Sequence, residues 1–565
     1  MNINATFNNV TWSTTEFDDQ FGSHIFTTAP NTLADGSTVT GGWGVGAARM
    51  GDISTTTWKC VLLNGDGGGS CIRWGVYANF ATTEGSVIQL GSDSGLYSTG
   101  PAPSSFWSND GTYMRIRTSV SGSGLVYKDG TTLFQPANSH TTFLEDTNGN
   151  TITCSVTNCT DTVGRVVNFN PNVNAPSSLT YLDSSNMLQT VSFAWQTFQL
   201  DAPWANGGTC SGVEPITCYT VDQTHSVSLI TQITLPNHLS YSFDYVTTAP
   251  GVTTGQIARI TLPTGGYIRY TYPCTSGTPC SNPTYSLAPS PEPWTSVTER
   301  FVSTDGSSST EKQWSYSQGT SQSGIGTPFT ITDPLGASQT TYFNNIICAP
   351  MPSQVDWRDS GGKLVQQVLN TVVYDSSAYS DPAPSPLTGQ CDNPRITISA
   401  KVLSDTNQKS QTTFTYGAFG NITDQYEYDW GNGGIGSLLR HTSYQFQHNS
   451  NSAYGDLSAH ILDRVTNKSI CDGGGTFCSQ TATSYDTTTI ASTAANAVIQ
   501  HDYTNHSYTS TVRGNPTVVS QFISSTAGNA VTTSYYNDVG NLIKVTDPNN
   551  NDTAFGYADN FANGV

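Results

Sequence analysis

The residues of this chain that could do chemistry are its aspartates and histidines, and neither set has the spacing of a catalytic site. A general acid–base pair needs two carboxyl groups held in different environments. The aspartates stand mostly beside Gly or Asn in turn sequences, where the carboxylate ordinarily accepts hydrogen bonds from its own backbone. The nine histidines are scattered, and only "HDYTNH" (501–506) brings two together, in a polar loop sequence. A metal between those two histidines is the minor alternative to a plain loop.

Other motifs that could carry chemistry are incomplete. The stretch "GDGGGSC" (65–71) has the glycines of a phosphate loop but lacks its Lys and its strand–helix context. The stretch "DPNNND" (547–552) imitates the first half of a calcium loop, yet Ala558 stands where a bidentate Glu is required. Weak calcium binding among the Asp and Asn turns stays open. We therefore predict no catalytic residue, no structural metal and no cofactor, and expect a protein that is not an enzyme.

The composition limits the class of partner. Only 11% of the 565 residues are charged, and 21 Lys and Arg against 41 Asp and Glu give a net charge of −20. An acidic excess spread along the chain argues against nucleic acid or an anionic membrane surface as a partner. No run of eighteen apolar residues exists, so we expect no membrane span.

The twelve cysteines fall into neighbours along the chain and indicate an oxidising compartment. None forms a CxxC motif, so disulfides that staple hairpins are the favoured interpretation over zinc sites. The predicted pairs are Cys60–Cys71, Cys154–Cys159, Cys210–Cys218, Cys274–Cys280, Cys348–Cys391 and Cys471–Cys478. The chain-entropy model gives roughly 2 kcal/mol for each short loop. We expect a secreted or cell-surface protein whose export signal lies upstream or has been lost, because "MNINATFNNVTW" is no signal peptide.

The elements that carry these residues are predicted to be short β-strands. Gly, Asn, Asp, Thr and Tyr suit strands and tight turns better than helices. In unit after unit, a turn is followed by alternating apolar residues and ends in Tyr or Phe, as in "GQIARITLPTGGYIRYTY" (255–272). There Ile260 and Leu262 should lie on one face of a strand, and Ile268, Tyr270 and Tyr272 on one face of the next, within reach across a hairpin. The predicted repeat-turn residues are Asp146, Gly149, Asp161, Gly164, Asp333, Gly336, Gly420, Asp538, Gly540 and Asp547.

Two regions follow from this pattern. Residues 1–104 are rich in Trp and Gly, and form either a β plug or a surface that stacks on glycans. Residues 105–565 carry the hairpin repeats, interrupted by Pro-rich loops near 282–294 and 380–391. A unit of one or two hairpins cannot bury its own aromatic face and must stack on its neighbours. The fold class is therefore all-β, with almost no helix: one long antiparallel sheet that winds.

The repeats resemble the YD repeats of the RHS family. The resemblance rests on Tyr536–Leu542 with the following Asp547-Pro turn, and on Asp146–Asn150, Asp161–Arg165 and Tyr416–Asn421. This family includes bacterial RHS toxins, the C components of insecticidal toxin complexes, wall-associated proteins and teneurins. The resemblance implies a sheet that spirals into a hollow shell, which in toxin members holds a C-terminal toxin. The family's terminal core is not seen here, and "DPLG" (333–336), similar to part of its cleavage motif, is interpreted as a repeat turn.

Three functions are compatible with such a sheet. The first is a secreted, non-enzymatic container or scaffold that holds an encapsulated polypeptide. The second is a subunit of an extracellular tube or filament that self-associates through the edges of its sheet. The third is an adhesin whose aromatic side chains bind glycans. We expect the container.

Overall fold

The computed structural model describes the backbone of strands within residues 1–108 and most residues after them. The described ranges are 111–119, 122–136, 141–162, 164–170, 176–200, 226–272, 297–320, 322, 325–343, 351–375, 392–456, 458–493, 498–524 and 527–557. The Trp side chains of residues 1–104 and both Pro-rich loops, 282–294 and 380–391, lie outside the described residues. The proposed division at residue 105 therefore stays a prediction.

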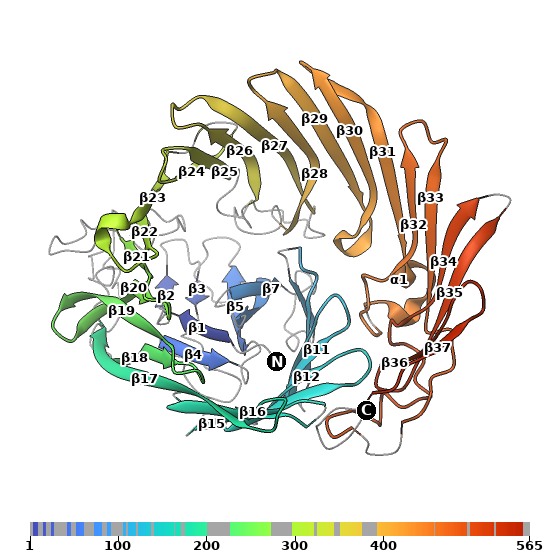
Figure 1. Ribbon diagram of the computed structural model, residues 1–565, viewed down its shortest axis with the longest axis horizontal. Helices are drawn as coiled ribbons and strands as arrows, with labels where there is room; N and C mark the ends of the chain where they lie inside the picture. The colour runs from blue at the N-terminus through green and yellow to red at the C-terminus, as the bar shows by residue number, and fades with distance from the viewer. Residues whose placement is uncertain are drawn as a thin grey trace.

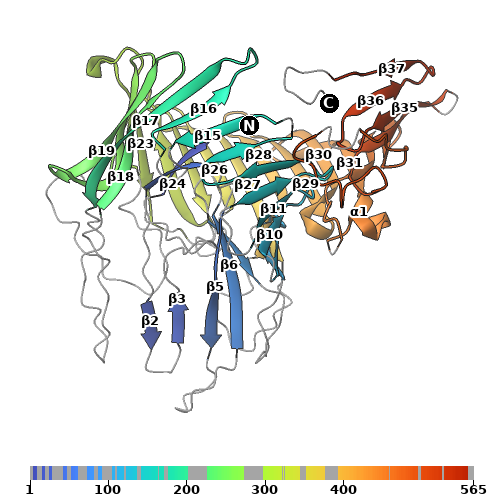
Figure 2. The ribbon, with the colours of Figure 1, turned by 90° about the horizontal axis from the view of Figure 1, so that it is seen from below.

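The first strands pair in two groups. They are β1 (Asn4–Asn8), β2 (Thr15–Asp18), β3 (His24–Thr27), β4 (Gly42–Gly46), β5 (Asp52–Val61), β6 (Arg73–Ala81), β7 (Val87–Gly91) and β8 (Ser105–Ser108). Strand β1 pairs with β4, and the pairing of β2, β3, β5, β6, β7 and β8 leads on into β9 (Arg115–Ser119). Figure 2 shows β5 and β6 extending to one side of the main sheet.

The rest of the chain adds strands in chain order. They are β10 (Gly122–Val126), β11 (Thr132–Pro136), β12 (Thr142–Glu145), β13 (Thr151–Cys154), β14 (Asn158–Thr160), β15 (Val166–Asn170), β16 (Ser178–Leu182), β17 (Leu188–Leu200), β18 (Ser226–Thr234), β19 (Ser240–Ala249), β20 (Val252–Thr261), β21 (Tyr267–Thr271), β22 (Glu299–Ser303), β23 (Lys312–Gln318) and β24 (Thr327–Thr332).

The second half continues in the same way. Its strands are β25 (Ser338–Phe343), β26 (Pro352–Arg358), β27 (Leu364–Asp375), β28 (Asp392–Leu403), β29 (Gln408–Tyr416), β30 (Ile422–Asn432), β31 (Ile435–Phe446), β32 (Val465–Asp472), β33 (Cys478–Tyr485), β34 (Pro516–Ser524), β35 (Gly528–Tyr536), β36 (Leu542–Thr546) and β37 (Asp552–Ala554). From β9 to β37 each strand pairs antiparallel with the next, which makes 29 strands in one sheet. The prediction of an all-β fold built on one long antiparallel sheet is confirmed.

The sheet curves until its end returns to its beginning. Figure 1 shows the wall passing through β17–β23, then β24–β31, then β32–β37, which come to lie beside β11 and β12. Adjacent strands of a sheet are rotated by the twist of the backbone, and a long sheet accumulates that rotation. Helix is confined, in the described residues, to α1 (Gln447–Ser450) and short 3₁₀ turns. None of these is long and apolar enough to span a bilayer.

One five-residue turn joins many of the hairpins and explains the repeated letters. In Asp146–Asn150 the amide of Asp146 donates to the carbonyl of Asn150, and the amide of Gly149 donates back to Asp146. The Asp146 carboxylate accepts from the amides of Asn148 and Asn150 at 2.8 and 2.9 Å. Gly149 has a φ of +88°, which a residue without Cβ adopts at least cost. This is a type I turn followed by a bulge, and it sets the register of the hairpin.

The same turn recurs at widely separated places. Aspartate accepts the turn amides in this way at Asp183, Asp333, Asp359 and Asp547. The amides of Met187 and then Ser185 lower the pKa of Asp183, because they stabilise its charged form. In "DPLG" the turn also forms, and Leu335 is 82% exposed at its tip. At the last repeat the capping side chain is Asn537, and the predicted turn residue Asp538 occupies the next position.

The buried core lies on one face of the strands from β13 to β20. Strand β15 alternates strictly, with Val167 and Phe169 buried between exposed neighbours. Phe193 and Phe198 of β17 belong to the same buried cluster, and the pairing of β17 with β18 shifts register between Ala194 and Trp195. The hairpin predicted within 255–272 is formed by β20 and β21, in which Ile260 lies opposite Ile268. In Figure 1, β4 lies close to β18, and the two strands are in contact.

Candidate functional site

The site that distinguishes this sheet from an open one is a seam where its two ends meet. We define the seam as the contact of residues 111–151 with residues 393–541. Two backbone hydrogen bonds cross the seam, each 2.9 Å long. The amide of Leu462 donates to the carbonyl of Lys128, and the amide of Thr151 donates to the carbonyl of Gln500. The positions joined are more than 300 residues apart in the chain, so the seam exists only because the whole sheet has curved.

Arg513 lies at the centre of the seam and is fully buried. Its guanidinium donates to five backbone carbonyls: those of Asn148 and Asp538 through one terminal nitrogen, His506 and Ser507 through the other, and Ser510 through Nε. These distances run from 2.6 to 3.3 Å. The five N–H groups of arginine are all used, which is what a buried guanidinium requires.

The charge of Arg513 is balanced by carboxylates close by. Burial lowers its pKa, and Asp538 and Asp486 oppose that effect. The carboxylate of Asp486 accepts from the amides of Arg513, Gly514 and Asn515 at 2.7–3.0 Å. It also accepts from the hydroxyl of Tyr454 at 2.6 Å, and burial together with this partner raises the pKa of Tyr454. Charge-assisted hydrogen bonds to Asp486 thus hold residues 513–515 in place at the seam.

Histidines lie along the whole seam. His460 is buried and its Nε2 lies 3.1 Å from the carbonyl oxygen of Tyr113. His501 Nε2 lies between the carbonyl oxygens of Asn148 and Asp538, at 2.9 and 3.1 Å. His506 Nε2 is 3.0 Å from the carboxylate of Glu145. The sequence "HDYTNH" therefore contacts the 145–150 turn. Among the described residues no group of three or more His, Cys, Asp or Glu could hold a metal.

Glycines allow the two ends to approach closely. A Cβ on Gly149 would lie 2.4 Å from the Cβ of His506, and one on Gly540 would lie 2.5 Å from the Asn148 side chain. A Cβ on Gly130 would meet the Ile461 side chain at 2.7 Å. These glycines therefore serve both their own turn and the contact across the seam.

Polar side chains complete the seam on either side of Arg513. Asn148 and Asn515 exchange amide hydrogen bonds, one of them at 2.7 Å. Farther along, Arg115 pairs with Asp456 at 3.0 Å.

The aromatic end of the seam contacts the middle of the sheet. Arg395 donates to the hydroxyl of Tyr113 at 2.9 Å. Lys128 donates to the carbonyl of Phe419 at 2.7 Å, and the Phe419 ring meets the Tyr113 ring edge-on. A Cβ on Gly420 would come within 2.5 Å of the Tyr113 ring. These contacts extend the seam to the turn between β29 and β30.

Of the predicted turn residues, the structure brings Asp146, Gly149, Gly420, Asp538 and Gly540 to the seam. Asp161 pairs with Arg165 at 2.6 Å beside the core, in the turn that contains Gly164. Asp333, Gly336 and Asp547 lie in turns away from the seam. Arg513, Asp486, Tyr454 and His460 are seam residues that no pattern in the sequence singled out. For Asp486 and Arg513, the one sequence feature that could have drawn attention is that residues 486–515 interrupt the alternation of apolar and polar residues seen in the strands on either side.

Two of the six predicted cysteine pairs lie within described residues. Cys154–Cys159 joins β13 to β14 inside the core, with both residues fully buried, and Cys471–Cys478 joins β32 to β33. The side chains of Cys60, Cys71, Cys210, Cys218, Cys274, Cys280, Cys348 and Cys391 lie outside the described residues.

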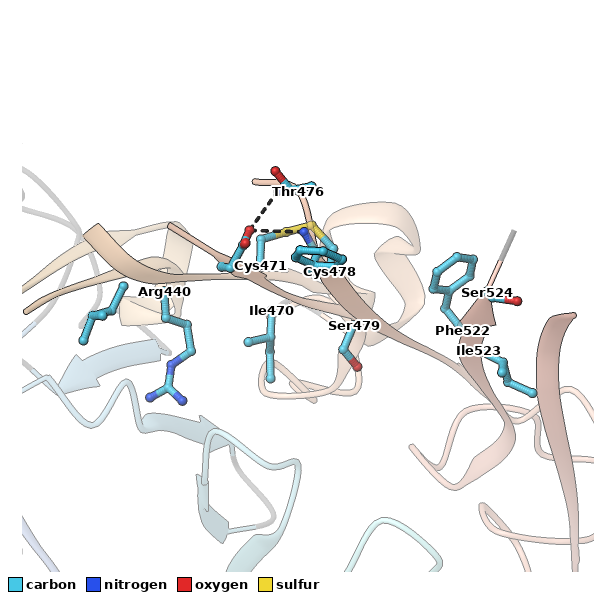
Figure 3. A pocket seen from close by; sticks show the side chains of 12 residues that line it. Arg440, Ile470, Cys471, Thr476, Cys478, Ser479, Phe522, Ile523 and Ser524 are labelled. Atoms are coloured by element: carbon cyan, nitrogen blue, oxygen red, sulfur yellow. Dashed lines mark hydrogen bonds between the residues drawn. A yellow bond between two sulfur atoms is a disulfide. The ribbon is translucent and has the colours of Figure 1, made fainter. Parts of the chain in front are cut away.

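A shallow groove of about 750 Å³ lies over the Cys471–Cys478 disulfide (Figure 3). Phe477 and Ile523 on its rim are 77% and 59% exposed. Its one carboxylate, Asp472, accepts the amides of Thr476 and Phe477 in its own turn. The groove offers apolar contact and is not arranged as an acid–base site.

No protein-family model and no curated protein matches this chain. Among solved structures, the complex titled TcdB2-TccC3-Cdc42 is 10% identical with a TM-score of 0.16, over 88% of this chain and 31% of that one. TcdB2-TccC3 without its hypervariable C-terminal region is 9% identical with a TM-score of 0.17, over 96% and 29%. The chain spans about a third of the length of these structures. At such TM-scores the likeness carries no argument, and the resemblance to the RHS family stays a prediction.

Proposed function

We propose that this protein is a secreted β-shell segment that acts as a container or scaffold and performs no catalysis. The observation that carries the proposal is the seam: one sheet of 29 strands returns to its own start and is fastened there by a fully buried arginine. A chain that only needed a surface for binding would not need to join residues 365 apart, as Arg513 and Asn148 are.

The contacts of the charged side chains support a structural role for the repeats. Aspartates of the repeats accept amides of their own turns, which leaves their carboxylates committed to structure. The disulfides Cys154–Cys159 and Cys471–Cys478 support an oxidising compartment outside the cytoplasm. An encapsulated polypeptide is the partner that a closed wall of this kind would serve.

A self-assembling filament is the second candidate, favoured by the last strand. All three residues of β37 are exposed, and Phe555 and Tyr557 just after it are 42% and 44% exposed. An exposed strand at the edge of a sheet can pair with another chain.

Electron microscopy of the purified chain under non-reducing conditions separates the two candidates. The container predicts discrete closed particles of one chain with low density at the centre, and an open, enlarged outline when Arg513→Met breaks the seam. Filaments with a regular rise would reject the container and make β37 the functional edge. Closed particles with a filled centre would reject the container and leave a scaffold.

A further inference from the structure

Two histidines of the seam each lie beside a cation: His501 beside the buried Arg513, and His448 beside the half-buried Lys128. His501 and Arg513 donate to the same two carbonyl oxygens, those of Asn148 and Asp538. With Nε2 as the donor, the proton acceptor of the neutral ring is Nδ1, which is buried without a hydrogen-bond partner among the described residues. A proton added there would have no acceptor and would place a second positive charge next to the guanidinium.

The second pair lies at the α1 end of the seam. His448 is packed between the rings of Phe419 and Phe446, at 5.4 and 5.9 Å between centroids. Lys128 reaches the same place from the β10–β11 turn and donates to the carbonyl of Phe419. Burial, and then the charge of Lys128, hold the pKa of His448 below its usual value. The two pairs thus lie at different places on the seam, and each sets a histidine beside a cation.

We propose that the seam is acid-sensitive: protonation of His448 and His501 places like charges side by side at both ends of the contact, and the two ends of the sheet separate. The direction follows from linkage. His448, whose pKa is lowered while the seam is closed, takes up a proton more readily once the seam is open. The closed seam therefore loses stability as the pH falls below about 6.5, the ordinary value for histidine.

Carboxylates lie on the elements next to both histidines. His501 forms a bridge with Asn150 and contacts the carbonyls of Asn148 and Asp538, so its neighbours include the turn of Asp146 and the turn of Asp538, with Asp502 next to it in the chain. The carboxylates of Asp146 and Asp538 accept backbone amides at 2.8–3.0 Å. His448 is faced by Lys128 and by Asp463, which opposes the effect of Lys128 more weakly.

One ion pair acts in the opposite sense. Protonation of His506 strengthens its contact with Glu145, but the two side chains are 21% and 28% exposed, and solvent-exposed pairs contribute little. Arg513 is fully buried, and ring nitrogens of His448 and His501 are buried, so water screens charges at these atoms less. The net response to acid is therefore opening.

Hydrogen exchange at about pH 7.5 and about pH 5, corrected for the intrinsic rate, tests the proposal. The seam is reported by the amides of Leu462, Thr151 and Asp502, which donate across it. The control is the β24–β25 hairpin, whose sequence contains no histidine. We expect the opening of the seam amides to rise at the lower pH relative to the control, because the open seam binds protons more readily.

The double variant His448→Gln/His501→Gln keeps donors but cannot be protonated, so its seam should follow the control hairpin at both pH values. His441→Gln, in β31 beside Asp424, is the matched variant outside the seam and should keep the wild-type response. Equal exchange of seam and control in the wild type would overturn the proposal, and this comparison needs no variant to fold. A response that survives in the double variant would also overturn it.

The inference rests on the seam, and only its use, release of what the shell holds, rests on the proposed function. If the seam opens in acid but the particles have filled centres, the container fails and the acid-sensitive seam stands.

Discussion

Arg513 stabilises the seam mainly through the hydrogen bonds that its buried position allows, more than through its charge alone. Replacing it with Met keeps much of the side-chain volume but removes five hydrogen bonds to backbone carbonyls from a buried place. Removing one partner of a buried charged network typically costs about 3–5 kcal/mol. We expect the urea midpoint of the seam, followed by exchange of the Leu462 amide, to fall accordingly.

The matched control is Arg165→Met. Arg165 also pairs with an aspartate, at 2.6 Å, but its side chain is 51% exposed. An exposed pair contributes about 0–1 kcal/mol, so this variant should stay close to wild type. Equal effects of the two substitutions would mean that Arg513 does not fasten the seam.

Glycine at the turn position separates local strain from contact across the seam. Gly149 and Gly362 have φ values of +88° and +80° in turns with the same hydrogen bonds. An alanine at either position costs about 1–2 kcal/mol of backbone strain. Gly149→Ala would also drive a Cβ into His506, whereas nothing lies within 4 Å of a Cβ on Gly362.

We therefore expect Gly149→Ala to destabilise the protein more than Gly362→Ala, and to raise exchange at Thr151 and Asp502 selectively. Denaturation and hydrogen exchange on the two purified variants measure both effects. If the two substitutions lowered the free energy of unfolding equally and neither changed exchange of the seam amides, the close approach of Gly149 to His506 would not contribute to the stability of the seam.

At the scale of elements, a second charged network lies among β20–β23, and its contribution to stability depends on pH. Arg269 makes a bidentate pair with Glu311 at 2.6 Å, and Tyr267 donates to the same carboxylate at 2.6 Å. The hydrogen bond from Arg269 is the largest cause that lowers the pKa of Glu311 to about 2. Because the folded pKa is depressed, the stabilisation is present above pH about 4.5 and is lost as the pH falls toward about 2.

Glu311→Gln should therefore lower stability at neutral pH and flatten its dependence on pH between about 4.5 and about 2. Glu299→Gln on neighbouring β22 is the control, since Glu299 accepts only from Thr271 and Gln313 among the hydrogen bonds of its side chain in the described residues. Unfolding midpoints of the three proteins across this range measure the difference. An unchanged slope in Glu311→Gln would show that the pair does not couple to folding.

The sequence predicts the elements far better than it predicts the seam. The turn at Asp146–Asn150 and the hairpin that brings Ile260 opposite Ile268 depend on residues close together in the chain, so the local sequence is enough to predict that these elements form. Arg513 could not be placed in the same way, because its acceptor Asn148 is 365 residues distant and meets it only after the twist of the intervening strands has accumulated. Asp538 shows the limit within a turn: the letters match the repeat, but Asn537 takes the capping position.

For the whole molecule, the pattern of contacts predicts the order of unfolding. From β9 to β37 each strand pairs with its neighbour in the chain, whereas the seam joins positions 282 to 389 residues apart. Closing a long loop costs more chain entropy than closing a hairpin. The core on β13–β20 is also remote from Arg513 in sequence and is stapled by Cys154–Cys159. The seam should therefore open while the hairpins persist.

Rising urea followed by hydrogen exchange makes this order visible. The amides of Leu462 and Asp502 should lose protection at lower urea than those of β15 and β17, with a smaller dependence on denaturant, because less surface is exposed when only the seam opens. Loss of protection everywhere at one urea concentration would mean that closure and the sheet form a single cooperative unit. In that case the seam would be part of the wall's own stability, and a shell of this construction would release its contents only by unfolding.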